Sequence, residues 1–232
     1  MRAPQFAVAA VMALAVLALA ACASAPPPKK ELTAQEIVDK AGDKMKELKS
    51  VHFRLELTDG KMALGPGITV ENIEGDAASP GRMRISTKAT IMGMVTEIEL
   101  IGVEGRQYLR NPLTKRWEAA PISLAGSDLF APEGAPSIMK SAKNLARLED
   151  EAIDGAESYH VKGTVESGLI AALVGGAPSN AQVQVEMWIG TADFFVRQIK
   201  LAGPLLQDDA AKIVRTLKLS KFNEPVTIEP PA

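Results

Sequence analysis

The segment VHFRLEL at residues 51–57 decides the fold class of this chain, because its apolar and polar side chains alternate without a break. Valine, phenylalanine and two leucines take the odd positions, whereas His52, Arg54 and Glu56 take the even ones. A period of two residues predicts a β-strand with one apolar face and one solvated face. The dipeptide Asp59-Gly60 then predicts a turn, after which the chain reverses.

The same alternation recurs on both sides of a helical segment. Further strands are expected at about 68–75, at 82–86 and, as one long strand, at about 90–103, so that residues 51–119 form six antiparallel strands. A second group of strands is expected at about 147–153, 159–165, 183–189 and 195–199, and between 215 and 228 after a turn.

Three segments have helical spacing instead. Thr33 and Glu36 form a capping box at the start of a helix expected over about 34–49. A second helix is expected near 136–146, and a short apolar one near 167–174. The predicted fold class is therefore α+β: one strongly curved antiparallel sheet of about ten to twelve strands, with helices packed on its concave side.

The N-terminus has the features of an export signal. Arg2 is followed by an apolar run that ends in Leu19-Ala20-Ala21-Cys22, which resembles the acylation site of bacterial lipoproteins. A transmembrane anchor is the alternative, but it needs about 20 apolar residues. We expect residues 1–21 to be a signal peptide, 22–31 an acylated cysteine with a proline-rich tether, and 32–232 a single domain.

The composition excludes several functions. The 26 basic and 28 acidic residues lack the basic excess of a nucleic-acid binder. One cysteine and two histidines cannot form a four-cysteine or two-cysteine, two-histidine zinc site, and no cofactor or metal is expected. Ser137 and Lys140 match the S-x-x-K pattern of some acyl enzymes, but the companion motifs are missing, so no enzyme is expected. His52 and His160 are expected to be solvent-facing strand residues.

The apolar side of the sheet has two interpretations. It forms a packed core, or part of it is left open by the few helices and holds an apolar ligand. Methionines and aliphatic residues are the candidate lining of such a lipid cavity: Phe53, Leu55, Leu57, Val70, Met83, Ile85, Met92, Met94, Ile98, Leu100, Met139, Val161, Val165, Leu169, Leu173, Val185 and Met187.

Several short segments together resemble the LppX/LprG-type lipoproteins of mycobacteria and their relatives. They include Glu74-Gly75-Asp76, Asp154-Gly155, the run YHVKGTV at 159–165, and Glu224-Pro225-Val226. The resemblance covers about residues 32–230. It implies a half-barrel similar to the LolA/LolB lipoprotein carriers.

The resemblance also implies a non-catalytic role. The expected function is to bind multi-acylated lipids or glycolipids and carry them between the membrane and the envelope, with an envelope transporter as a candidate partner. The alternative is a lipid-anchored interaction or sensor module that docks a protein partner without carrying lipid. In both cases the protein is expected to be exported and attached through acylated Cys22 to the outer face of the cell membrane.

Overall fold

The computed structural model describes residues 31–65, 67–120, 130–174 and 178–231. By its contacts the chain divides into Met1–Glu31 and Leu32–Ala232, and the fold below is that of the second unit. Cys22 and the expected signal peptide lie outside the described residues. Among the residues that are described, no helix combines the length and the apolarity needed to span a bilayer.

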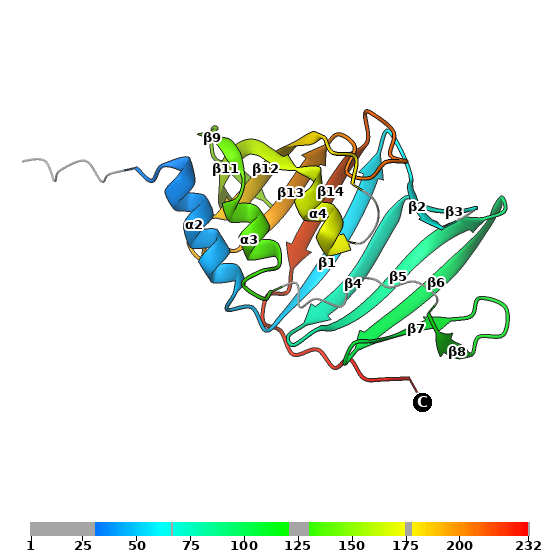
Figure 1. The fold of residues 1–232 in the computed structure, drawn as a ribbon. Coiled ribbons are helices and arrows are strands. Elements are labelled where there is room, and N and C mark those ends of the chain that lie inside the picture. Colours follow the sequence, from blue (N-terminus) through cyan, green and yellow to red (C-terminus); the bar gives the residue numbers. More distant parts are fainter. Residues whose placement is uncertain (1–30, 66, 121–129, 175–177, 232) are drawn as a thin grey trace, which may run out of the picture. The chain divides into compact units, whose positions relative to one another are not determined.

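The second unit combines three helices with fourteen strands in its described part (Figure 1). The helices are α2 (Ala34–Met45), α3 (Ala135–Lys140) and α4 (Ser167–Val174). The strands before α3 are β1 (Ser50–Thr58), β2 (Met62–Gly65), β3 (Ile68–Val70), β4 (Asn72–Ala78), β5 (Arg82–Ile91), β6 (Met94–Val103), β7 (Arg106–Arg110) and β8 (Trp117–Ala119). Those after it are β9 (Lys143–Arg147), β10 (Glu151–Ile153), β11 (Ala156–Glu166), β12 (Gln182–Gly190), β13 (Val196–Ala202) and β14 (Val214–Ser220).

All fourteen strands belong to one antiparallel sheet with the order β10-β11-β12-β13-β14-β1-β4-β5-β6-β7-β8, to which β2, β3 and β9 are added at the sides. The last strand, β14, pairs with the first, β1, so the two ends of the domain meet in the middle of the sheet. Phe53 on β1 lies opposite Leu219 on β14 and Gly75 on β4. In the described chain β8 and β10 lie at the two ends of this order and do not pair with each other, so the curved sheet is not closed into a barrel.

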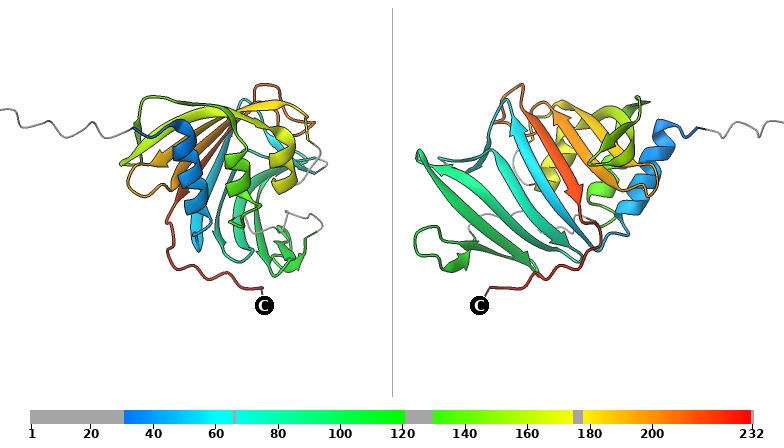
Figure 2. Two further views of the ribbon diagram at one scale, coloured as in Figure 1. Left: turned by 60° about the vertical axis from the view of Figure 1, so that its left-hand side comes forward. Right: turned by 180° about the vertical axis from the view of Figure 1, so that it is seen from behind.

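The helices all pack on one face of the sheet, as predicted (Figures 1 and 2). Helix α2 begins with the expected capping box, in which the backbone N–H of Thr33 donates to Glu36 Oε2 at 2.8 Å and the Glu36 N–H donates to Thr33 Oγ1 at 3.2 Å. Its buried side, which includes Ile37, Val38 and Met45, packs in the same core as β11, β12 and β13. We call this side of the sheet the inner face and the opposite side the outer face.

The helix predicted at 136–146 is wrong in its second half. Helix α3 ends at Lys140, and β9 begins at Lys143 and pairs with β11. Local spacing favoured a longer helix, but the edge of β11 offers backbone hydrogen bonds to this segment. Gly163 makes that pairing possible, because a Cβ there would lie 2.9 Å from both the Leu145 side chain and the Lys143 carbonyl oxygen.

The predicted long strand at 90–103 is also wrong. Residues Met92 and Gly93 form the turn between β5 and β6, with φ angles of 49° and 83°. Two successive positive φ angles are typical of a tight two-residue hairpin turn. The apolar residues around Gly93 continued the strand pattern and concealed the turn. Residues 50–119 form eight strands rather than six, because β2 was not predicted and the strand expected at 68–75 divides into β3 and β4.

The C-terminal segment packs on the outer face without forming the strand expected there. Ile228 is 1% exposed and packs with Ile101, Val103 and Val226. The backbone carbonyl of Ile228 accepts a hydrogen bond from Arg82 at 3.4 Å. These contacts hold an extended tail across the outer side of β5 and β6.

Candidate functional site

The inner face is apolar on every long strand, but the helices cover only part of it. Helix α2 lies against α3, β9 and β11, and α4 lies against α3 and β11. In Figure 1 these helices stand in front of the β9–β14 side, whereas no helix of the described residues stands in front of β5 and β6. The rear view in Figure 2 agrees with this arrangement. The inner face therefore divides into a covered half and an open half.

The covered half is a packed core. Five of the predicted lining residues lie there and are at most 6% exposed: Met139, Val161, Val165, Val185 and Met187. They belong to the same buried cluster as Ile37, Val38 and Met45 of α2. In the covered half the structure therefore favours the packed-core interpretation.

The open half is formed by β1, β3, β4, β5, β6 and β7. Four of the predicted lining residues are buried together at its base: Val70, Ile85, Ile98 and Leu100. Around them lie half-buried apolar side chains, and no helix of the described residues covers them. They include the predicted residues Phe53, Leu55 and Met83, and also four residues that the sequence pattern did not single out: Ile68, Ile73, Ile91 and Leu109. We call these seven side chains, together with the four buried ones, the open apolar face.

Space remains above this face at β6. Gly102 lies opposite Met83, and a Cβ placed on it would meet no atom of the described residues within 4 Å, its two chain neighbours aside. Leu55 and Ile73 lie directly opposite each other on β1 and β4. Apolar side chains in such an arrangement can bury acyl chains, because each Å² of apolar surface removed from water gains about 25 cal/mol.

Besides the five residues of the covered half, four predicted lining residues with described side chains are not part of the open apolar face: Leu57, Met92, Met94 and Leu169. Met92 and Met94 are 87% and 70% exposed, because Met92 lies in the hairpin turn and Met94 is the first residue of β6 directly after it. Leu169 on α4 is 41% exposed. The side chain of Leu173 lies outside the described residues. Leu57 is 9% exposed and continues the inner face of β1 toward β14.

A buried ion pair closes one end of the inner face. Arg215 lies opposite Leu57 and Leu201, and its guanidinium donates to Asp209 Oδ2 at 2.6 Å. The same oxygen accepts the backbone N–H groups of Leu205 and Leu206 at 2.8 and 2.7 Å. Both charged side chains are at most 5% exposed. The pair therefore fixes the loop between β13 and β14 against the inner face.

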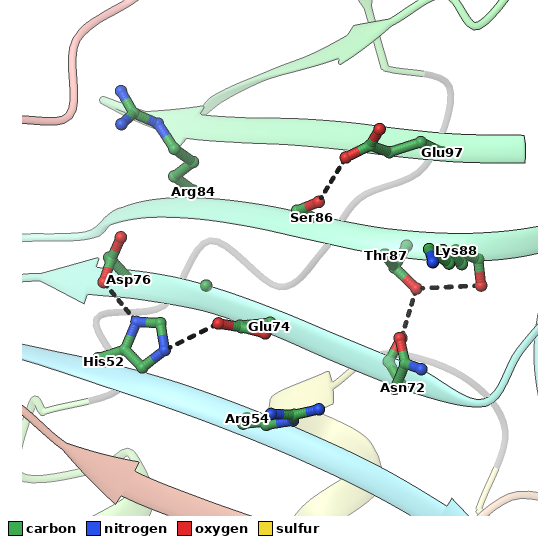
Figure 3. A pocket seen from close by; sticks show the side chains of 11 residues that line it. His52, Arg54, Asn72, Glu74, Asp76, Arg84, Ser86, Thr87, Lys88 and Glu97 are labelled. Atoms are coloured by element: carbon green, nitrogen blue, oxygen red, sulfur yellow. Dashed lines mark hydrogen bonds and ion pairs between the residues drawn. The ribbon is translucent and has the colours of Figure 1, made fainter.

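The outer face carries a polar groove of about 530 Å³ (Figure 3). Its walls come from β1, β4, β5 and β6 and hold charges of both signs, among them Arg54, Arg84, Lys88 and Glu97. Figure 3 shows His52 between two carboxylates, with Nδ1 at 2.8 Å from Asp76 and Nε2 at 3.2 Å from Glu74.

This groove does not form a nucleophilic dyad. Ser86 lies in it, but its hydroxyl donates to Glu97 Oε1 at 3.3 Å, and both ring nitrogens of His52 face carboxylates. A histidine that activates a serine needs one nitrogen free to accept the hydroxyl proton. Within the described ranges, no cluster of three or more His, Cys, Asp and Glu side chains is arranged to hold a metal ion.

The S-x-x-K pair is not arranged for catalysis either. Lys140 Nζ lies 2.6 Å from Asp43 Oδ1 on α2, and this hydrogen bond raises the pKa of the lysine. Hydrogen bonds from Lys140 and Lys46 lower the pKa of Asp43 to about 2. This contact favours the charged form of the Lys140 amine over the neutral form that would accept a proton. Its contact with Asp43 instead joins α3 to α2.

His160 departs from its predicted exposure. It lies on the outer face of β11 as expected, but only 6% of it is exposed. Its ring stacks on Trp188 with centroids 4.3 Å apart, and its nitrogens lie 3.0 Å from Glu186 and 3.4 Å from Glu151. The neighbouring tryptophan and carboxylates cover a residue that alternation alone placed in solvent.

Known proteins resemble this chain over nearly its whole length. Residues 33–228 match the family described as LppX_LprAFG lipoprotein. The lipoarabinomannan carrier protein LprG of Mycobacteroides abscessus is 21% identical over 225 residues, which cover 95% of each chain.

Two solved structures share the fold. The crystal structure of LprF from Mycobacterium bovis matches with a TM-score of 0.69 and 20% identity, over 86% of this chain and 97% of that one. The crystal structure of LppX from Mycobacterium tuberculosis matches with a TM-score of 0.62 and 18% identity, over 84% and 98%. At these identities the two structures support the fold alone.

Proposed function

Because the chain belongs to the LppX_LprAFG lipoprotein family, we propose that it binds acylated lipids or glycolipids and carries them between the membrane and the envelope. Membership in this family implies an exported protein that is associated with the envelope. A relative that spans the same length is named as a lipoarabinomannan carrier, and this name supports a glycolipid as one class of cargo.

The observation that carries the proposal is the open apolar face. Three of its apolar side chains are only half-buried: Leu55, Ile73 and Met83. The helices described cover the other half of the inner face and leave this half open. A lipid tail that lies across these side chains removes this apolar surface from water. Each buried CH₂ group gains about 0.8 kcal/mol, so about ten such groups give roughly 8 kcal/mol. The affinity then comes from the area of contact and needs no specific motif.

The proposed anchor is an acyl group on Cys22. The three prolines and two lysines that follow it favour an extended tether between the lipid and the domain. An envelope transporter remains the proposed protein partner, since a carrier has to receive its cargo from a membrane component or hand it over to one.

We propose further that the protein is not an enzyme. Two observations support this: the amine of Lys140 is held by Asp43, and the two ring nitrogens of His52 face carboxylates. The docking alternative would be favoured by an apolar patch on the outer strand face. The polar groove on the outer face is lined mainly by charged and polar residues and is not such a patch. We therefore retain lipid carriage as the proposed function.

The test compares two neighbouring residues of β4. We replace Ile73→Asp on the open apolar face and Asn72→Asp, as the matched control, on the outer face. Both variants are made in residues 22–232 with Cys22→Ser, and binding of a pyrene-labelled two-chain phospholipid is titrated by fluorescence. We expect Ile73→Asp to weaken binding at least about tenfold, because it loses apolar contact and buries a carboxylate beneath the acyl chains.

The control is expected to bind within twofold of the parent protein. Thermal unfolding of both variants shows whether each has kept its fold. Equal affinity of a folded Ile73→Asp variant and its control would overturn the placement of the lipid on this face.

A further inference from the structure

The turn between β5 and β6 exposes three large apolar side chains to solvent. Met92, Met94 and Val95 are 87%, 70% and 72% exposed. Among the described residues they are the only large hydrophobic side chains of such high exposure that are adjacent in the chain. Single exposed apolar residues are normal on protein surfaces, but a group of three at one turn is not.

A second turn extends this apolar end of the sheet. Strand β3 pairs with β5 through Ile68 opposite Ile91, and the backbone N–H of Met92 donates to the carbonyl oxygen of Gly67 at 3.2 Å. Residues 62–70 and 89–96 contain no charged residue, in a chain of which 23% is charged. We call residues 67–68 and 91–95 together the apolar tip.

The apolar tip is continuous with the open apolar face. Met94 lies opposite Ile91, which packs against the cluster that contains Val70, Ala89 and Ile98. On the inner side of these strands no charge separates the exposed methionine from the open apolar face. An acyl chain could therefore pass between them without crossing a charged side chain.

The backbone adds an independent observation. Met92 has a φ of 49°, in the left-handed region that glycine, asparagine and aspartate adopt far more readily than methionine. A large apolar side chain at this position is unfavourable for the backbone and, in water, for the side chain. An unfavourable conformation of this kind is typical of functional sites. Insertion of the Met92 side chain into an apolar environment would offset the cost of exposing it to water.

We propose that the apolar tip inserts into the surface of a lipid bilayer and sets the point at which lipid passes between the membrane and the open apolar face. This inference rests on the proposed carrier function for its choice of a bilayer as the partner. The uncharged surface fits hydrocarbon, and flexible methionines adapt to acyl chains. Because no charge takes part, this contact is expected to be insensitive to salt.

Because the proposed acyl anchor on Cys22 keeps the domain near the membrane, the apolar tip needs only a weak affinity for the bilayer. The nine residues between Cys22 and Leu32 span at most about 30 Å when fully extended. A domain tethered at that distance meets the bilayer at a high effective concentration. The tip then needs to supply only the orientation of the domain.

The test uses a cysteine-free background and a matched exposed residue. In residues 22–232 with Cys22→Ser, a single cysteine is introduced by Met92→Cys or by Leu113→Cys and labelled with the fluorophore NBD. Leu113 is 91% exposed at the separate turn between β7 and β8, close to Lys115 and Arg116. With neutral phosphatidylcholine vesicles we expect the label at 92 to brighten and shift to the blue, and the label at 113 to remain unchanged.

Aspartate substitutions give a second measurement. Aspartate tolerates the left-handed backbone at position 92, so Met92→Asp should fold. We expect it to reduce co-sedimentation with the same vesicles about tenfold at both low and high salt, and Leu113→Asp to change it less than twofold. Equal behaviour of the two positions in either assay would overturn the proposal. A dimer that is lost on Met92→Asp would also overturn it, because a second copy would then cover the tip.

Failure of this inference can be distinguished from failure of the proposed function. Titration with the pyrene-labelled lipid is repeated on the same variants. Lipid binding without any vesicle response at position 92 would refute the membrane contact and leave the carrier function. A vesicle response without lipid binding would support the membrane contact and refute the carrier function.

Discussion

Replacing Gly75 by alanine tests how the sheet is built at the point where its two apolar cores meet. Gly75 lies in β4 between Phe53 on β1 and Ile85 on β5. A Cβ on this residue would overlap the carbonyl oxygen of Arg84 and lie 2.9 Å from Cζ of Phe53. The Arg84 backbone cannot rotate away as a flexible side chain can, so the two strands must separate.

The size of the effect follows from what that separation breaks. Moving the Arg84 carbonyl to an ordinary contact distance of about 3.5 Å disturbs the hydrogen bonds between β4 and β5 at this point. Each buried backbone group left without a partner costs about 1–3 kcal/mol. With one or two such groups lost, and Phe53 displaced from both cores, we expect Gly75→Ala to lower the free energy of unfolding by about 2–5 kcal/mol.

Gly102 is the matched control, because it is also a strand glycine of the inner face and has open space around it. Alanine there restricts the unfolded chain and is expected to change stability by about 0–1 kcal/mol in the favourable direction. Urea unfolding followed by the fluorescence of Trp117 and Trp188 measures both variants. A Gly75→Ala variant within about 0.5 kcal/mol of the parent protein would refute the packing described for β4.

Three further predictions concern contacts outside the open apolar face. Asp209→Ala leaves the buried Arg215 unpaired and should destabilise the domain by about 3–5 kcal/mol in urea unfolding; a loss below about 1 kcal/mol would contradict the burial of the pair. The pKa of Asp43 is lowered to about 2 from its ordinary 3.8, so its pair with Lys140 should stabilise the fold above pH 4 and be lost between pH 4 and 2. In urea titrations Asp43→Asn should remove this small pH dependence, and an unchanged dependence would show that another carboxyl group causes it. Ile228→Ala, at a residue 1% exposed, should cost about 2–4 kcal/mol, and no loss would mean that the tail does not pack on the outer face.

Local patterns were enough to predict the main elements. The capping box at Thr33 and Glu36 marked the start of α2, and the alternation from residue 51 to 57 marked β1 and its two faces. The apolar run at 167–174 became α4 with the predicted bounds. These features depend on residues a few positions apart, so the sequence alone contains the information that determines them.

Features that depend on distant contacts were not predictable in this way. Helix α3 ends early because the chain after it pairs with β11 as β9. The residue that allows this pairing is Gly163, which lies about 20 residues later in the sequence. Alternation identified the apolar face but could not show which strands α2 and α3 would cover. For that reason Met187 was predicted beside Met83, although one lies in the packed core and the other on the open apolar face.

The most direct measurement of the central claim is native mass spectrometry of residues 22–232 with Cys22→Ser, purified from the organism that encodes the chain, beside the same protein with Gly102→Trp. A tryptophan at this position would project into the open space above β6 and occupy the surface available to acyl chains. The account predicts mass adducts on the parent protein that extract as acylated lipids, and a marked loss of these adducts on a folded Gly102→Trp variant. A parent protein that carries no adduct, even after incubation with lipid extract from that organism, would contradict it.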